Sequence, residues 1–333
     1  MTLAVSSLVT LPYYALAPGS ARDVGALIAA EGVQTYPASG EVLLTTITLG
    51  KVTALEALIG WARADVDVVS QDELIPPDTS DADYRRFNEE VMDDSKQTAI
   101  VVALRRLGYQ VNERGDGALV DRVLSQFPSN GRLEPGEVIK KIDGQAVALV
   151  QEATALIAAR RPGDVLHLEV ASPDGSRVRN VDVPLAADPE QGGKAVLGVF
   201  LRTANRGFDL PFPVEIRSES IGGPSAGLAF ALGVIDQLTE GELTGGRKIA
   251  VTGTIEIDGR VGDVGGVPQK TAAVKEAGAD VFLVPAGELK AARERAGKGL
   301  VVIPVTTLQE ALDALASVGG DLAGLSTAQK AAA

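Results

Sequence analysis

A serine between small residues and an apolar segment is the residue of this sequence best suited to nucleophilic chemistry. Ser225 follows Gly222, Gly223 and Pro224, and the segment 226–235 after it contains no charged residue. This segment predicts a buried helix, whose N-terminus would direct a partial positive charge toward the hydroxyl. Glycines let the backbone approach a substrate closely and offer amides to a developing oxyanion. The same pattern also fits a serine that merely caps a helix.

A serine hydroxyl needs a base before it attacks a carbonyl, and the sequence offers lysine for that role. The single histidine, His167, lies in an alternating stretch that predicts a strand, so we expect it at the surface or half-buried. Lys270 follows Gly265-Gly266 and begins a predicted helix. Its amine is a base only when neutral, so its pKa must fall from about 10.4 to about 7 or 8. Burial beside an apolar helix can supply the cost of about 4 kcal/mol. Lys248 and Lys275 are the competing lysines.

Composition excludes several other kinds of chemistry. The 333 residues suffice for two domains, and 44 acidic against 31 basic residues give a net charge of −13, so we expect no nucleic-acid partner. With no cysteine and one histidine, the sequence predicts no metal site and no disulfide. The phosphate-binding pattern G-x-x-x-x-G-K-[ST] is absent from it, and we expect no cofactor. An oligomeric state is left open.

The first residues allow two interpretations. Residues 2–16 carry no charge, but this run is shorter than a bilayer span, and the first basic residue is Arg22. One interpretation is a strand that enters the core. The other, which we favour, assigns residues 1–20 to a truncated membrane anchor.

The next segment predicts a small α+β lead-in over residues 21–106. Residues 41–49 are rich in Thr, Val, Ile and Leu and predict a strand, and residues 54–63 have apolar positions at helical spacing. A charged segment, 81–94, then leads into a predicted helix at 98–107.

The pattern changes to short strands and turns over residues 107–187. The run from Asn130 to Ile139, followed by Ile142-Asp143-Gly144, resembles the bacterial PDZ pattern. The resemblance implies that an extended peptide binds as an added strand at a sheet edge. We expect the groove strand at Leu107, Gly108 and Tyr109, with the helix that begins at Val150 as the other wall. Gly115-Asp116-Gly117 is the competing placement.

Strands and helices alternate over the predicted domain 190–320, which indicates a mixed α/β fold. Strands are expected at 194–201, 212–216, 248–255, 281–284 and 300–304, and helices at 226–238, 270–277, 288–295 and 308–316. Residues 321–333 are expected to form a flexible tail.

The motif Gly222 to Gly227 is similar to the nucleophile motif of the Lon proteases. Thr252-Gly253, Asp258 to Val261, Gly265-Gly266 and Lys270 match the later part of the Lon pattern in order and spacing. The resemblance implies a catalytic Ser225-Lys270 dyad, with Thr252 orienting the lysine and Gly222 and Gly223 shaping the oxyanion site. It also implies a Lon-type proteolytic domain with a fold like ribosomal protein S5 domain 2.

The order of a PDZ domain and a Lon-type domain resembles the membrane-anchored PDZ and Lon domain proteins of Gram-positive bacteria. This resemblance implies a single-pass protein of the cell membrane whose catalytic part is extracytoplasmic.

These patterns predict an ATP-independent serine endopeptidase that cleaves extended or misfolded peptide segments selected by the PDZ domain. Its expected partners are peptide or protein substrates and, through the N-terminal segment, a membrane. One alternative is a catalytically inactive PDZ peptide-binding regulator. Another is a small-molecule kinase of the related fold, but the sequence lacks the Ser-Ser continuation that this family would show after Gly227.

Overall fold

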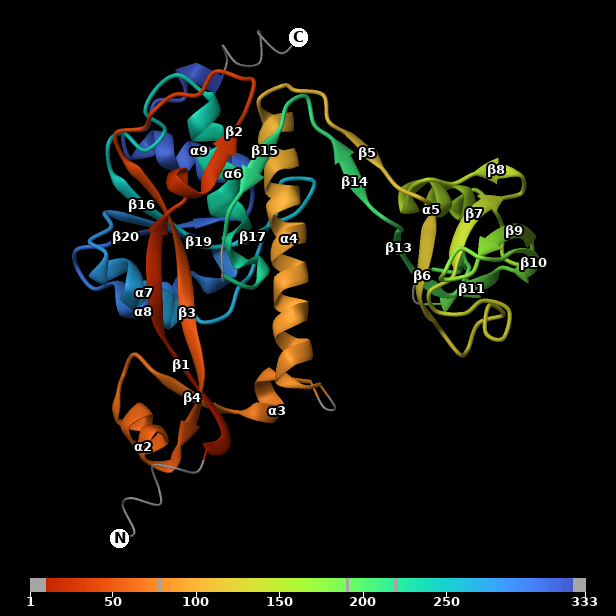
Figure 1. The fold of residues 1–333 in the computed structure, drawn as a ribbon, viewed down its shortest axis with the longest axis horizontal. Coiled ribbons are helices and arrows are strands. Elements are labelled where there is room, and N and C mark those ends of the chain that lie inside the picture. The colour runs from red at the N-terminus through yellow and green to blue at the C-terminus, as the bar shows by residue number, and fades with distance from the viewer. Residues whose placement is uncertain (1–9, 77–78, 190–191, 219–220, 326–333) are drawn as a thin grey trace. The chain divides into compact units, whose positions relative to one another are not determined.

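The computed structural model describes residues 10–76, 79–189, 192–218 and 221–325. The chain forms two compact units (Figure 1). The first unit contains Met1–Gln110 and Leu210–Ala333, and the second contains Val111–Asp209. The second unit is therefore an insertion into the first.

A mixed six-stranded sheet organises the first unit. Its strand order is β20-β19-β16-β3-β1-β4. The strands β3, β16, β19 and β20 pair in parallel, whereas β1 pairs antiparallel with both β3 and β4. The bounds are β1 Thr10–Asp23, β3 Glu41–Thr53, β4 Asp67–Ser70, β16 Lys248–Val251, β19 Val281–Pro285 and β20 Val301–Val305.

Helix α6, Gly227–Leu238, is the buried element predicted from the uncharged segment. Every residue of this helix except Gln237 is buried. It packs against α4, Asp81–Arg106, and against β3. The other helices of the unit are α2 Ala54–Ala62, α3 Gln71–Leu74, α7 Val267–Glu276, α8 Leu289–Ala296 and α9 Leu308–Ser317. Short pairs join β2, Ile28–Ala30, to β15, Val214–Ile216, and β17, Thr254–Ile255, to β18, Val261–Gly262.

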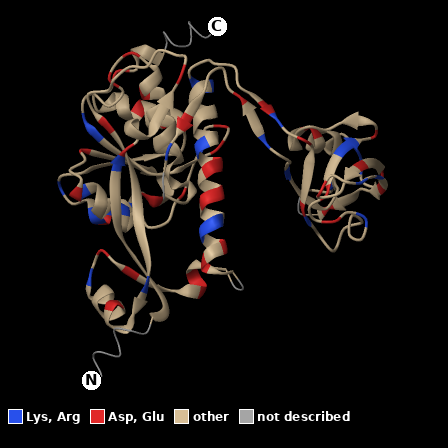
Figure 2. Ribbon diagram, in the orientation of Figure 1, with Lys and Arg blue, Asp and Glu red and all other residues tan. Residues whose placement is uncertain are grey.

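Helix α4 is longer than the sequence pattern predicts, because the charged segment 81–94 is helical as well (Figure 2). Ser80 caps its N-terminus by accepting a hydrogen bond from the Asp83 amide. Acidic residues lie in the first turn and Arg105 and Arg106 in the last, which suits the helix dipole. An apolar stripe covers only the later turns, so periodicity reveals only that part of the helix.

The second unit is built on an antiparallel sheet of order β10-β9-β7-β6-β13. Buried aliphatic residues on several of its strands form its core, among them Val120, Ile139 and Leu168. The elements are β5 Asn112–Arg114, β6 Ala118–Val123, β7 Val138–Ile142, β8 Gln145–Ala146, α5 Val150–Ala158, β9 Val165–Ala171, β10 Val178–Pro184, β11 Ala186–Asp188, β12 Lys194–Val196, β13 Val199–Thr203 and β14 Gly207–Asp209.

The predicted mixed α/β fold with a small β-rich domain is confirmed, but the structure divides the chain differently from the expected boundaries. The lead-in 21–106 is no separate part, because β3 pairs with β16 in one sheet. The β-rich unit extends past 187 to Asp209, because β13 completes its sheet by pairing with β6.

The segment expected as a membrane anchor, 1–20, is also different in the structure. Its residues 10–20 belong to β1, which is the strand alternative, and residues 1–9 lie outside the described part. None of the helices in the described ranges has both the length and the apolar character needed to cross a membrane. Of the predicted tail, residues 326–333 are likewise outside the described part.

Candidate active site

The nucleophile candidate sits in a short 3-10 turn, Pro224–Ala226, that runs directly into α6. Gly223 precedes the turn with φ of 85° and ψ of 151°, a backbone conformation that essentially only glycine adopts. Ser225 is half-buried at this entrance to the helix. The backbone therefore fixes the direction in which the serine enters the site.

Helix α4 holds the loop before Ser225 through two hydrogen bonds. The Gly223 amide donates to the Asn88 carbonyl over 3.0 Å, and Ser95 Oγ donates to the Pro224 carbonyl over 3.1 Å. The Gly223 amide is therefore already engaged with the Asn88 carbonyl. The expected oxyanion role of Gly223 stays a prediction.

Lys270 lies on the first turns of α7 with its side chain buried, 2% exposed. Its Nζ donates to Thr252 Oγ1 over 3.1 Å. Burial lowers its pKa to about 8, and the negative charge of Glu288 opposes this fall only in part. Among the described residues no carboxylate forms an ion pair with it, so a substantial fraction of the amine is neutral near pH 8.

Thr252 connects the lysine to the serine. Its hydroxyl accepts from Lys270 Nζ and donates to the Ser225 carbonyl over 3.3 Å, while the Gly253 amide donates to the same carbonyl over 2.9 Å. Thr252 is fully buried. The hydroxyl thus connects the backbone of the nucleophile turn to the amine of α7. Its role in orienting the lysine stays a prediction.

Ser225 and Lys270 line one pocket of about 610 Å³. Gly222 and Gly223 line it as well, together with residues of β1, β3 and α4. The structure therefore brings together the predicted nucleophile, base and glycines. Their chemical roles stay predictions.

The competing lysines lie in other surroundings. Lys248 Nζ pairs with Glu41 over 3.2 Å at the surface, and Lys275 Nζ donates to the Arg295 carbonyl over 3.0 Å on an exposed face. Neither residue lines the pocket of Ser225. Of these three lysines, only Lys270 is buried and lines the pocket of Ser225.

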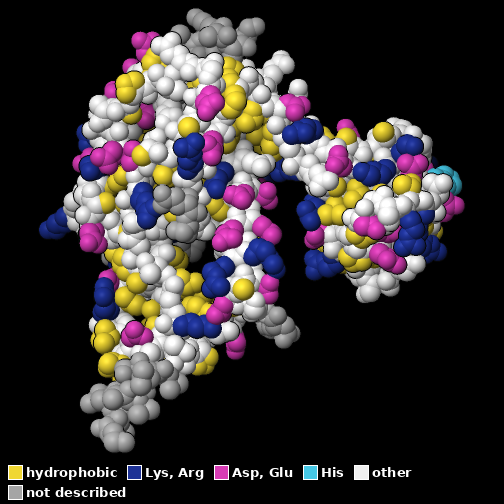
Figure 3. Space-filling model, in the orientation of Figure 1, with side chains coloured by type: hydrophobic (Ala, Val, Ile, Leu, Met, Phe, Trp, Pro, Cys, Tyr) yellow, Lys and Arg dark blue, Asp and Glu magenta, His cyan; other side chains and the backbone are white. Residues whose placement is uncertain are grey.

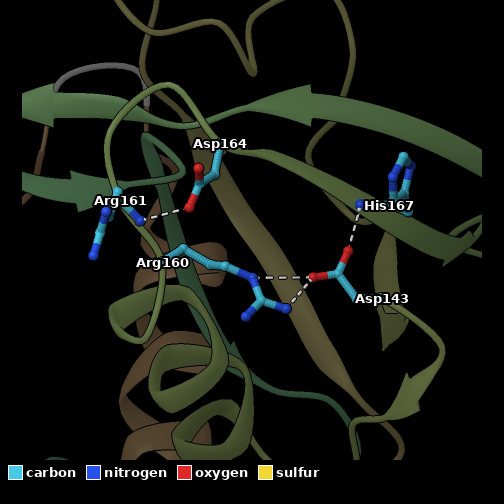
Figure 4. Close-up of polar contacts among 5 residues, drawn as sticks. All are labelled: Asp143, Arg160, Arg161, Asp164 and His167. Atoms are coloured by element: carbon cyan, nitrogen blue, oxygen red, sulfur yellow. Dashed lines mark hydrogen bonds and ion pairs between the residues drawn. The ribbon is translucent and has the colours of Figure 1, made fainter.

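His167 lies in the second unit, on β9, as an exposed strand residue, which confirms its predicted position. Figure 4 shows its backbone amide donating to Asp143, over 3.0 Å, while the ring points away from that carboxylate. Asp143 also accepts from Arg160, and the Arg161 amide donates to Asp164. The ring itself contacts Asp182 Oδ1 at 2.7 Å, which raises the pKa of His167. These contacts order a turn and do not form a nucleophile site.

The residues expected to form the peptide groove lie elsewhere. Leu107, Gly108 and Tyr109 follow α4 in the first unit, where Leu107 is fully buried and the Tyr109 ring meets Phe212 edge to face at 5.2 Å. The competing segment Gly115-Asp116-Gly117 precedes β6, which has a partner strand on each side. The edge strands of the second unit's main sheet are β10 and β13, and β13 contacts α5. A peptide-binding role of residues 107–109 stays a prediction.

The sequence did not reveal Asn88 and Ser95 as residues of the site. No local pattern in a charged helical segment shows that a hydroxyl or a backbone carbonyl will form a hydrogen bond with a loop far away in the sequence. The pocket walls from β1 and β3, including Ser20 and Thr46, were missed for the same reason.

Two domain families match the chain. The Lon protease (S16) C-terminal proteolytic domain matches residues 219–317, and the PDZ domain matches residues 99–171. Lon protease 2 of Herpetosiphon aurantiacus is 27% identical over 172 residues, which cover 48% of this chain and 21% of that protein. Lon protease 2 of Bacillus subtilis is 36% identical over 93 residues, or 28% of this chain and 16% of that protein.

A solved PDZ domain of the SdrC-like protein from Listeria monocytogenes is 28% identical, covers 26% of this chain and 87% of its own, and has a TM-score of 0.24. The matched region spans only about a fifth of the first of the Lon relatives. The two family matches show a Lon-type proteolytic domain and a PDZ domain within the chain. In the structure, β1, β3 and β4 share one sheet with strands of the matched proteolytic segment.

Replacing Lys270 by methionine is expected to stabilise the first unit at neutral pH. Below about pH 8 the amine is charged in both the folded and the unfolded chain, so the folded state bears the full cost of desolvating the charge. This cost is about 3 kcal/mol, because the pKa of Lys270 falls from 10.5 in the unfolded chain to about 8 in the folded one. Between pH 8 and pH 10.5 the Lys270 amine stays protonated only in the unfolded chain, so the free energy of unfolding of the wild type rises with pH. Urea unfolding, followed by far-ultraviolet circular dichroism, should show that the difference in the free energy of unfolding between the two proteins closes over that range. A difference independent of pH would contradict the buried amine.

Replacing Ser95 by alanine is expected to slow acylation of Ser225 about fivefold, because one hydrogen bond of about 1 kcal/mol no longer holds the Pro224 carbonyl. The measurement is the rate of inactivation by a serine-directed acylating reagent across pH. The pH midpoint should stay unchanged, since Lys270 keeps its surroundings. Thr98→Ala on the same helix is the control and should react like the wild type. A shifted midpoint in Ser95→Ala would mean general loosening of the core instead of loss of positioning.

Proposed function

We propose that the chain is a serine endopeptidase in which neutral Lys270 removes the proton of Ser225. The observation that carries this proposal is a buried amine of pKa about 8 in the same pocket as a serine at a helix N-terminus. As the serine oxygen attacks a peptide carbonyl, its proton passes to Lys270 Nζ. The protonated lysine then gives this proton to the leaving amine, and water hydrolyses the acyl-enzyme in a second round.

Backbone amides of the nucleophile turn are proposed to hold the oxyanion. Gly223 supplies the turn's shape, while the amide of Ser225, in the first helical turn, is the donor we favour because such amides have no partner within the helix. The dipole of α6 adds to this stabilisation.

The proposed substrates are extended peptide segments. Residues 17–23 of β1 lie beyond the part of that strand that pairs with β4, and several of them line the pocket. An extended chain can lie along such a strand. Because the sequence carries no phosphate-binding loop motif, we propose that cleavage needs no ATP and acts on segments that are already unfolded.

The test combines hydrolysis with covalent labelling. Ser225→Ala and Lys270→Ala are each expected to lose nearly all cleavage of an unstructured casein-type substrate, because they remove the nucleophile and its base. Lys275→Ala is the control and should keep wild-type activity. Wild-type cleavage should rise with pH through about 8 and then level off, since only the neutral amine accepts the proton. Mass spectrometry should place an acyl adduct on Ser225.

The alternative, an inactive peptide-binding regulator, predicts a different outcome. Peptides would bind, but Ser225 would not be labelled at any pH and no cleavage would depend on Lys270.

We further propose that the PDZ domain selects peptides through β13 rather than through residues 107–109. Val199 and Leu201 of β13 are partly buried and pack on the core together with Leu156 of α5. An extended peptide added to the edge of β13 would lie between that strand and α5. The backbone turn at Gly198, with φ of 77°, would bring amides to the peptide's C-terminal carboxylate.

Two neighbouring substitutions on β13 test this placement. Leu201→Ser should weaken binding of an apolar C-terminal peptide about tenfold, or 1.4 kcal/mol, because its side chain faces the core side of the strand. Phe200→Ser is the control, since alternate residues of a strand point to opposite faces and Phe200 stacks instead on Arg122 at 4.3 Å. Fluorescence anisotropy of a labelled peptide gives both affinities. Equal affinities for the two variants, both well folded, would place the groove elsewhere.

We also propose that the protein is associated with the cell membrane through its N-terminal segment and that its catalytic part is extracytoplasmic, as in the membrane-anchored proteins of Gram-positive bacteria that the sequence resembles. The support is that the uncharged run of the sequence begins before β1, with no charged side chain at residues 2–9. We also propose that the protein assembles into an oligomer. A measurement of its molecular mass in solution tests this proposal.

A further inference from the structure

Helix α2, Ala54–Ala62, has its small residues inside and its large apolar residues outside. Ala57 and Gly60 are its buried positions, and a Cβ at Gly60 would lie 2.6 Å from Val68 Cγ2. The small residues thus let the helix pack closely on β4. Four large side chains remain in solvent: Leu55 is 38% exposed, Leu58 61%, Ile59 53% and Trp61 61%. We call these four residues the α2 apolar face.

The charged groups around this face are already engaged within the protein. Glu56 accepts hydrogen bonds from the Thr53 amide and hydroxyl, Arg63 pairs with Asp65 at 2.6 Å, and Lys51 pairs with Asp81 at 2.6 Å. The rim therefore offers little unbalanced charge, and attraction to this surface would be mainly apolar.

The first described residue of the chain, Thr10, lies beside the N-terminus of the same helix. Residues 1–9 contain no charged side chain, and Thr10, which follows them, pairs with Thr53, the N-cap of α2. Figure 1 shows α2 at the end of the paired strands β1 and β3 where β1 begins. Figure 3 shows hydrophobic side chains gathered at this end of the unit.

We propose that the α2 apolar face lies on a lipid bilayer as a second, interfacial contact. This inference rests on the membrane association proposed above and deepens it. Trp at the edge of an apolar helix face is typical of the interface between headgroups and acyl chains. A second copy of the chain is the less suitable occupant, because a face of four side chains falls far short of the roughly 20–30 residues a side of a stable protein interface.

Trp61 makes the inference measurable, since it is the only tryptophan in the sequence. The full chain is mixed with neutral phosphatidylcholine vesicles, with and without bromine on the acyl chains. The expected result is a blue shift of the Trp61 emission and quenching by the brominated lipid. Both effects should persist at high salt, because the contact does not depend on charge.

Leu58→Gln combined with Ile59→Gln should lower vesicle binding by α2 about tenfold, as two apolar side chains are lost from the contact, and should abolish quenching of Trp61. Val178→Gln, an equally exposed position on β10 of the second unit, is the control and should leave both unchanged. Ser225→Ala should also bind normally, so failure of the catalytic proposal would not affect this result.

Three results overturn the inference in distinguishable ways. Vesicle binding without quenching of Trp61 would leave the N-terminal contact but remove α2 from the membrane. Absence of any vesicle binding would sink both membrane proposals. A blue shift that depends on protein concentration without vesicles would show that a second copy covers the face.

Discussion

The amine of Lys270 is removed from water without gaining a carboxylate partner among the described residues, and this desolvation underlies the chemistry proposed for the chain. The same burial that costs folding free energy lowers the pKa of the amine to about 8. A solvated lysine at this place would remain charged and could not take a proton from Ser225. The apolar helix α6 and the close packing of α7 on the sheet are therefore requirements of the site as well as of the core.

Positioning depends on contacts between segments that lie far apart in the sequence. Thr252, after β16, bridges the lysine on α7 and the carbonyl of Ser225. Asn88 and Ser95 on α4 hold the turn from the other side. The inserted unit begins a few residues after α4 and ends at Asp209, before β15 and the nucleophile turn. The insertion thus leaves a complete sheet and a complete site in the first unit.

The edges of the two sheets provide the surfaces on which peptides are proposed to bind. In the first unit β1 extends past its partner β4 into the pocket of Ser225. In the second unit β13 is the edge strand beside α5. Backbone groups at such edges can pair with any extended chain, so the apolar and glycine-rich surroundings, rather than the edges themselves, must provide selectivity.

The sequence by itself determined the dyad candidates, the buried helix after Ser225 and the mixed α/β class, because residue type, glycine spacing and periodicity are local properties. It did not determine that residues 10–20 form a strand of the first unit, that the charged segment 81–94 is helical, or that β13 is an edge strand of the second unit's sheet. Those outcomes depend on pairing across long stretches of chain, as between β3 and β16 or β6 and β13. Only the tertiary structure decided them, because the free energy of a strand or a buried amine comes from neighbours that the local sequence does not specify.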